Sequence, residues 1–155
     1  MDRAIGLSSG LGSLVSLTVE SSTALCGTLK SFQNKETAVR DLRNEAQDLD
    51  SVLRTLQETV DDMTVEVDIL RQPLTRCRDA CRDFNTLIKE STEHSTEERT
   101  SIWDWLKLRY MGEDITGFKN MLAGYKSTVI IALVFNNMYF LCTRFNCLVT
   151  NHIIA

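Results

Sequence analysis

Five cysteines and two histidines are the side chains with which this sequence could bind a metal or attack a substrate. Cys77 and Cys81 stand four residues apart, which places both thiols on one face of a helix. A zinc site needs two further soft ligands, and the sequence has no second cysteine pair or Cys–His pair at that spacing. We therefore interpret both cysteines as small apolar residues of a core, and we expect no bound metal.

The two histidines give no better support for catalysis. His94 lies in a polar stretch and His152 near the end of the sequence, and nothing positions either one beside a nucleophile. The sequence contains no phosphate-binding or dinucleotide-binding glycine motif and no HExxH zinc motif. We predict no catalytic residue, no cofactor and no small-molecule substrate, so the chain is not expected to be an enzyme.

Composition favours a helical fold. The chain has 155 residues, of which 43% are hydrophobic and 25% charged, as in an ordinary globular protein. One proline and seven glycines leave little material for a turn-rich β fold. We predict an all-α protein without a sheet, built as an up-and-down bundle of four to five helices.

Charge and cysteine usage narrow the class of partner and the compartment. Residues 34–100 carry 10 basic and 16 acidic side chains, a balance of −6, within a chain of net charge −4. Phosphate binding needs clustered cations, so we predict no nucleic-acid partner. The N-terminus lacks the basic lead and compact apolar run of a signal peptide, so we expect reduced thiols and a cytoplasmic protein, with membrane association left open.

Apolar residues recur at helical spacing along four segments. They predict helices over Leu7–Phe32, Val39–Val60, Val67–Ile88 and Ile115–Ala132. Asn34 is a candidate N-cap for the second helix, and Asp61-Asp62 is expected to mark its end.

The regular helical spacing is interrupted at two places. Pro73 predicts either a kink in the third segment or a new helix that starts with the proline at its first position. Residues 91–100 are polar and unpatterned, which predicts a loop, and Ser101 is a candidate cap for a short segment behind it.

The N-terminal segment has features of an association helix. Gly6 and Gly10 form a G-x-x-x-G spacing, which lets two helices approach closely in lipid, and Leu7, Leu11 and Leu14 form its apolar stripe. The alternative is a frayed N-terminus, because each glycine costs a helix about 1 kcal/mol.

Two further segments are candidates for membrane contact. Trp103 and Trp105 predict either an interfacial anchor or a short helix that closes one end of the bundle. Residues 127–143 contain no charge, but Asn136 and Asn137 lie near their centre and would be costly in hydrocarbon.

Three runs carry a resemblance to a known family: AVRDLRNEAQDLDSVLRTLQETVDD, PLTRCRDACRDFNTLI and LRYMGEDITGFKNMLAGYKSTVIIAL. Over roughly residues 1–133 the chain resembles the fungal N-terminal domain of STAND receptors. This domain is also called the azaphilone pigment biosynthesis cluster protein L N-terminal domain. It is similar to the HeLo-like helical domains that precede nucleotide-binding oligomerisation modules.

The resemblance implies an all-α bundle that acts as the signalling or effector end of a longer receptor. HeLo-like relatives are thought to release an apolar N-terminal helix on oligomerisation and to disturb membranes. Here that helix would be Ala4–Lys30. The expected function is a non-enzymatic interaction domain that binds a protein partner or associates with itself. The alternative is a membrane-active protein that inserts this helix or the C-terminal apolar segment.

Residues 134–155 depart from the expected family pattern. The run VFNNMYFLCTRFNCLVTNHIIA is rich in apolar residues and has Arg144 as its one Lys, Arg, Asp or Glu. We predict a bundle domain over residues 1–133 and hypothesise that the tail is translated intron or the product of a truncated gene model.

Sequencing the native transcript across codons 125–155 tests the hypothesis about the tail. Splicing that removes the tail and continues the frame is the expected result. Transcripts that retain the tail in frame would contradict it.

Overall fold

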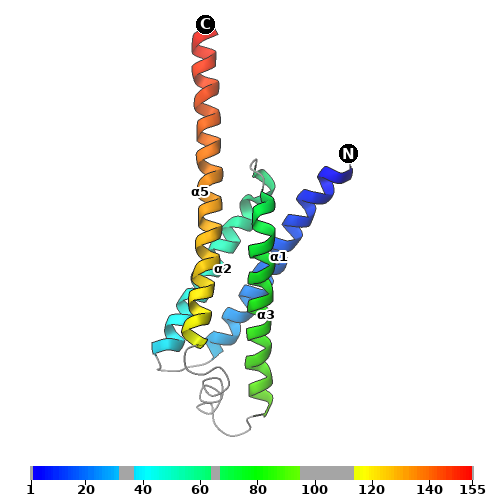
Figure 1. Ribbon diagram of the computed structural model, residues 1–155, viewed down its shortest axis with the longest axis vertical. Helices are drawn as coiled ribbons and strands as arrows, with labels where there is room; N and C mark the ends of the chain where they lie inside the picture. The colour runs from blue at the N-terminus through cyan, green and yellow to red at the C-terminus, as the bar shows by residue number, and fades with distance from the viewer. Residues whose placement is uncertain (1, 32–36, 64–66, 95–113, 155) are drawn as a thin grey trace.

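The computed structural model describes residues 2–31, 37–63, 67–94 and 114–154, and these form four α-helices without a strand. The helices are α1 (Asp2–Ser31), α2 (Thr37–Thr59), α3 (Arg71–His94) and α5 (Asp114–Ile154). Two short 3-10 turns, η1 (Val60–Asp62) and η2 (Val67–Leu70), follow α2 and precede α3. Successive helices alternate in direction (Figure 1), which confirms the predicted all-α up-and-down bundle.

The four helices pack side by side as a closed ring around one hydrophobic core. Helix α1 lies between α2 and α3, and α2 packs against α5. The contact between α3 and α5 is smaller, and it includes the stacked rings of Phe84 and Phe118, whose centroids are 4.1 Å apart. This aromatic pair closes the ring of four helices.

The core consists of the apolar stripes that the spacing predicts. In α2 the buried residues are Val39, Leu42, Ala46, Leu49, Leu53 and Leu56. In η2 and α3 they are Leu70, Leu74, Cys77, Cys81, Phe84 and Ile88. In α5 Ile115, Leu122 and Val129 are buried, while Phe118, Tyr125 and Ala132 are partly buried against them. Both cysteines of α3 are therefore core residues, as predicted.

The third segment divides ahead of Pro73. Turn η2 ends at Leu70 and α3 begins at Arg71, so Pro73 is the third residue of the new helix. Amide groups in the first turn of a helix have no intrahelical partner, so the missing N–H of the proline costs no hydrogen bond there. A new helix was one of the two predicted outcomes, and it starts two residues earlier than predicted.

The prediction of a loop over residues 91–100 was wrong for residues 91–94. Helix α3 continues through residues 91–94 and ends at His94. This stretch contains neither glycine nor proline, and the loss of apolar periodicity does not by itself end a helix. Residues 95–100 lie outside the described residues, as do the candidate caps Asn34 and Ser101.

Polar side chains are built into the contact between α1 and α3. The hydroxyl of the buried Thr18 donates to the Leu14 carbonyl at 2.7 Å and lies 3.3 Å from the carbonyl of Leu74. Thr28 Oγ1 lies 2.5 Å from Asn85 Oδ1. Buried polar groups are costly unless they are hydrogen-bonded, so these contacts fix the position of α1 along α3.

We expect Leu49→Ala to lower the free energy of unfolding by about 2–5 kcal/mol, because Leu49 is fully buried and the substitution leaves a cavity. Ile69→Ala is the matched control, since Ile69 is 78% exposed and should change stability by less than about 0.5 kcal/mol. Urea denaturation followed by circular dichroism measures both. Equal effects of the two substitutions would contradict this core.

Candidate functional site

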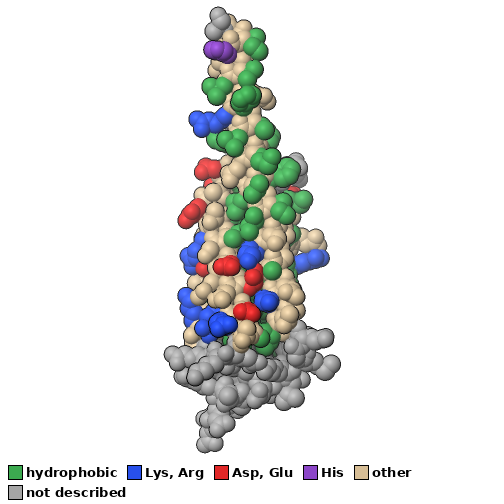
Figure 2. All heavy atoms as spheres, turned by 90° about the vertical axis from the view of Figure 1, so that its left-hand side faces the viewer, with side chains coloured by type: hydrophobic (Ala, Val, Ile, Leu, Met, Phe, Trp, Pro, Cys, Tyr) green, Lys and Arg blue, Asp and Glu red, His purple; other side chains and the backbone are tan. Residues whose placement is uncertain are grey.

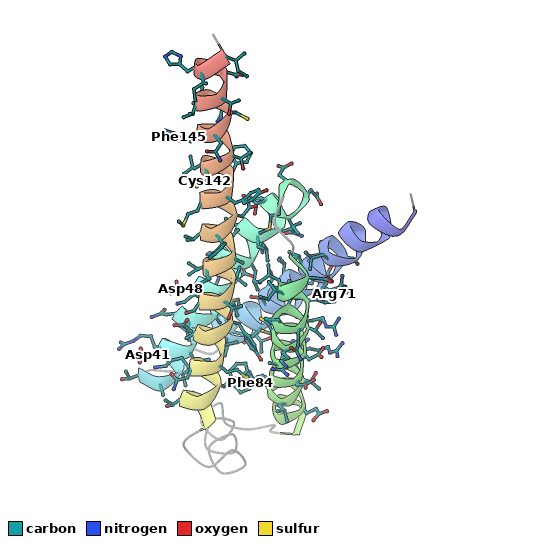
Figure 3. The ribbon with its side chains drawn as sticks, turned by 45° about the horizontal axis from the view of Figure 1, so that its top comes forward. Asp41, Asp48, Arg71, Phe84, Cys142 and Phe145 are labelled. Carbon is teal, nitrogen blue, oxygen red and sulfur yellow. The ribbon has the colours of Figure 1, made fainter. Side chains whose placement is uncertain are left out.

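The C-terminal half of α5 extends beyond the bundle. Figure 1 shows α5 continuing past the ends of α2 and α3. Among the described residues, Leu133 is the last apolar residue of α5 that packs against the core. Figure 3 labels Cys142 and Phe145 on the part of the helix that stands alone.

This part of α5 is strongly apolar and exposed. Figure 2 shows hydrophobic side chains gathered along it. The exposed large apolar residues are Ile130, Ile131, Val134, Phe135, Met138, Tyr139, Phe140, Leu141, Phe145, Leu148, Val149, Ile153 and Ile154. Monomeric soluble proteins rarely expose a continuous apolar surface of this extent, so this part of α5 is the candidate site.

One side of α5 faces the bundle, and its character changes along the helix. Residues seven apart lie on nearly the same side of a helix, with a drift of about 20° per heptad. Every seventh residue from the N-terminal end of α5 is first buried and apolar: Ile115, Leu122 and Val129. The next three at the same spacing are polar: Asn136, Thr143 and Thr150. The line of residues through Val129 therefore changes from buried and apolar to polar at Asn136.

The side of α5 that faces away from the bundle changes from small or polar residues to apolar ones. In the first half of α5 it presents the exposed residues Gly117, Asn120, Gly124 and Ser127. In the second half it presents an apolar line, the outer stripe, which we define as Ile131, Val134, Met138, Leu141, Phe145 and Leu148. These six residues are between 49% and 68% exposed. The line through Val129 thus becomes polar where the outer stripe begins, and among the described residues the bundle packs against the first of these two lines and not against the second.

A charged contact anchors α5 to α2 just before this change. Lys126 Nζ lies 2.6 Å from Glu45 Oε1 and 3.6 Å from Asp48 Oδ2. The hydrogen bond with Glu45 raises the pKa of Lys126, so the ammonium stays charged at physiological pH. The projecting half of α5 therefore starts from a fixed point on the bundle.

The thiols of the bundle are enclosed in the core. Cys26, Cys77 and Cys81 are buried. Burial raises the pKa of Cys26 to about 11, and a hydrogen bond with Cys77, together with burial, raises the pKa of Cys81. Within the described ranges, no group of three or more His, Cys, Asp or Glu side chains is arranged to hold a metal ion.

The predicted N-terminal association residues lie in α1. Leu11 and Leu14 belong to the core, with exposures of 3% and 8%, so neither is presented to a partner in this conformation. Gly10 is partly buried, and Gly6 and Leu7 lie in the helix where side chains are not described. The structure does not bring these residues together with the outer stripe.

The remaining candidates fall elsewhere. Trp103 and Trp105, the predicted anchor, lie outside the described residues. His94 is the last residue of α3, and His152 is exposed near the end of α5, on a different element.

The outer stripe is the feature that sequence reasoning missed. Its signal was present, because the six residues follow one another at intervals of three or four. The stripe was not predicted, because a long apolar segment of low charge is equally typical of a membrane span.

Comparison with protein families gives a match over most of the chain. A family model described as "Pigment biosynthesis cluster protein PigL N-terminal" matches residues 2–150. The match continues past Leu133, where the resemblance was expected to stop, and includes most of the projecting helix. The domain boundary at residue 133 and the origin of the tail stay predictions. No curated protein and no solved structure matches the chain.

We expect two of the five thiols, Cys142 and Cys147, to react rapidly with Ellman's reagent in dilute native protein, because both are exposed. The three enclosed thiols should react slowly, and all five should react in guanidinium chloride. Cys26 stays mostly protonated between pH 7 and pH 9, because its pKa is about 11.

Cys142→Ser with Cys147→Ser is the matched control, and it should remove the rapid phase without changing the slow one. Three or more rapidly reacting thiols in the native protein would show that the bundle does not enclose its cysteines.

Proposed function

This chain belongs to the family of PigL N-terminal domains of pigment biosynthesis cluster proteins, and we propose that it is a non-enzymatic helical interaction domain. In this proposal the bundle is a rigid base, and the projecting half of α5 makes the contact with another protein. The resemblance to N-terminal domains of fungal STAND receptors supports a signalling or effector role in the cytoplasm.

The outer stripe is the observation that carries this proposal. Burying one Leu or Phe side chain contributes about 1.5–3 kcal/mol, so six such positions in water represent a large unrealised stabilisation. Monomeric soluble proteins rarely expose a continuous apolar surface of this extent unless something binds there. Association that covers the stripe would recover this energy without any change in the bundle.

The placement of the reactive side chains supports a non-enzymatic role. The three bundle thiols are enclosed in the core, where a substrate does not reach them. The exposed cysteines Cys142 and Cys147 lie on the projecting helix, and His152 lies near its end. Nucleophilic catalysis needs a base within hydrogen-bond reach of the nucleophile, and no contact of this kind is formed by these residues among those described.

Membrane insertion is the second candidate, and one observation favours it. The segment Ile115–Ile154 is long and apolar enough to cross a bilayer by length and composition. However, Arg144 and the pair Asn136-Asn137 lie within the projecting half. A central arginine costs about 2.5–3.5 kcal/mol on insertion scales, so protein association fits this helix better.

Flotation of the full chain with vesicles of phosphatidylcholine and phosphatidylserine separates the two candidates. We expect the chain to stay at the bottom of the density gradient, because the polar side of α5 disfavours lipid.

Two variants sharpen this experiment: Leu141→Lys on the outer stripe and Thr143→Lys on the opposite side of the same helix. Lipid surrounds an inserted helix, so both lysines would reduce flotation in a membrane protein. Flotation of the unaltered chain that both variants abolish would therefore establish insertion and overturn the protein-association proposal.

A further inference from the structure

The outer stripe lacks an occupant, and we propose that the occupant is a second copy of this chain, paired antiparallel through the projecting halves of α5. This inference rests on the proposed function and specifies its partner. It follows from the side-chain pattern around the stripe, from its direction relative to the bundle and from its charge.

The spacing of the outer stripe is that of a coiled coil. The intervals from Ile131 to Leu148 are three, four, three, four and three residues, which cover about three heptads. Apolar residues at alternating intervals of three and four over this length indicate helix pairing. The stripe contains no charged side chain, so two copies of it can face each other without repulsion.

The residues beside the stripe differ on its two edges. One edge consists of the residues that directly follow Val134, Leu141 and Leu148, and it is apolar: Phe135, Cys142 and Val149. The other edge, on the opposite flank of the stripe, is polar beyond Ile130: Asn137, Arg144 and Asn151. A helix with such unequal edges distinguishes between the two directions of pairing.

Antiparallel pairing matches these edges and parallel pairing does not. In a parallel pair each edge meets the opposite edge of the partner, so apolar Phe135, Cys142 and Val149 would face polar residues. In an antiparallel pair the apolar edge of one copy meets the apolar edge of the other, and the two polar edges meet likewise, because the second helix runs in the opposite direction. The apolar edges then extend the buried seam, while the polar edges face each other next to water.

The register with the greatest overlap pairs all six stripe residues. Met138 of one copy faces Leu141 of the other, Val134 faces Phe145, and Ile131 faces Leu148. A two-fold axis generates each contact twice, which is the isologous arrangement of most homodimers. In this register Arg144 stands opposite Asn137, so the two guanidinium groups do not meet.

The described helices of the bundle leave the outer stripe uncovered. The outer stripe lies on the side of α5 opposite to Ile115, Leu122 and Val129, which face the bundle. Each bundle therefore lies on the far side of its own helix and at the opposite end of the pair. Each chain carries a net charge of −4, and charges farther apart than the screening length of about 8 Å at physiological salt repel each other weakly.

Along the bundle-packed part of α5, the side of the helix that continues the stripe is open. Gly124 and Ser127 are exposed in line with the stripe, and a Cβ atom added to Gly124 would meet no atom within 4 Å. The end of the second copy can therefore pass along α5 at this level.

Sedimentation equilibrium of the full chain tests the pairing. We expect a concentration-dependent dimer for the unaltered chain. Leu141→Lys places a charge in the seam and should raise the dissociation constant by at least about 30-fold, the effect of a central interface residue. Thr143→Lys is the matched control on the opposite side of the helix and should change it by less than about threefold.

Cysteine cross-linking tests the direction. In a background of Cys142→Ser and Cys147→Ser, we expect Met138→Cys alone to give no disulfide-linked dimer with oxidised glutathione. Met138→Cys combined with Leu141→Cys should give one, because residues 138 and 141 of the two copies face each other in the antiparallel pair. A dimer linked by Met138→Cys alone would indicate parallel pairing and overturn the proposed direction.

The outcomes separate this inference from the proposed function. A chain that stays monomeric and does not float with vesicles would overturn pairing with a second copy, while association with a different protein would stand. A dimer that tolerates Leu141→Lys would show that the outer stripe is not the contact, which would overturn both.

Discussion

Helix α5 has two apolar faces on opposite sides, and the bundle packs against the first of them. Up to Leu133 the helix packs apolar residues against the bundle, and from Val134 onward its large apolar residues are exposed to solvent. A straight helix cannot turn both faces toward one core, because its side chains keep fixed angular positions. The exposure of the projecting half is therefore a consequence of the sequence order around residue 130.

Two contacts with the bundle hold α5 in place. Lys126 contacts Glu45 and Asp48 of α2 immediately before the apolar face changes sides. The stacked rings of Phe84 and Phe118 connect α5 to α3 near its other end. These contacts lie apart from the outer stripe, so a partner could cover the stripe without disturbing the core.

The bundle was predictable from the sequence because each of its helices carries a single apolar stripe. The residues of α2 from Val39 to Leu56 and the thiols of Cys77 and Cys81 occupy the positions that helical periodicity requires. The start of α3 was misplaced by two residues, since a proline is tolerated throughout the first turn of a helix.

The outer stripe was not predicted, because the stretch around Ser127–Thr143 is uncharged and mostly apolar over its whole length. Two stripes on opposite sides add up to a helix that looks apolar on every side, which is typical of a membrane span. The two stripes can be told apart only when it is known which residues of α5, such as Val129, are buried by the bundle. The role of Leu11 and Leu14 was open for the same reason, because an apolar stripe does not reveal whether it faces a core or a partner.

Hydroxyl-radical footprinting of the unaltered chain at low and high protein concentration tests the central claim most directly. Met138 and Phe145 lie on the outer stripe, whereas Tyr139 and Phe140 lie beside it on other sides of the same helix, and all four are more than half exposed. The account predicts that oxidation of Met138 and Phe145 falls as the concentration rises, while oxidation of Tyr139 and Phe140 stays constant. Equal protection of all four residues, or no protection of any, would contradict an interaction face confined to the outer stripe.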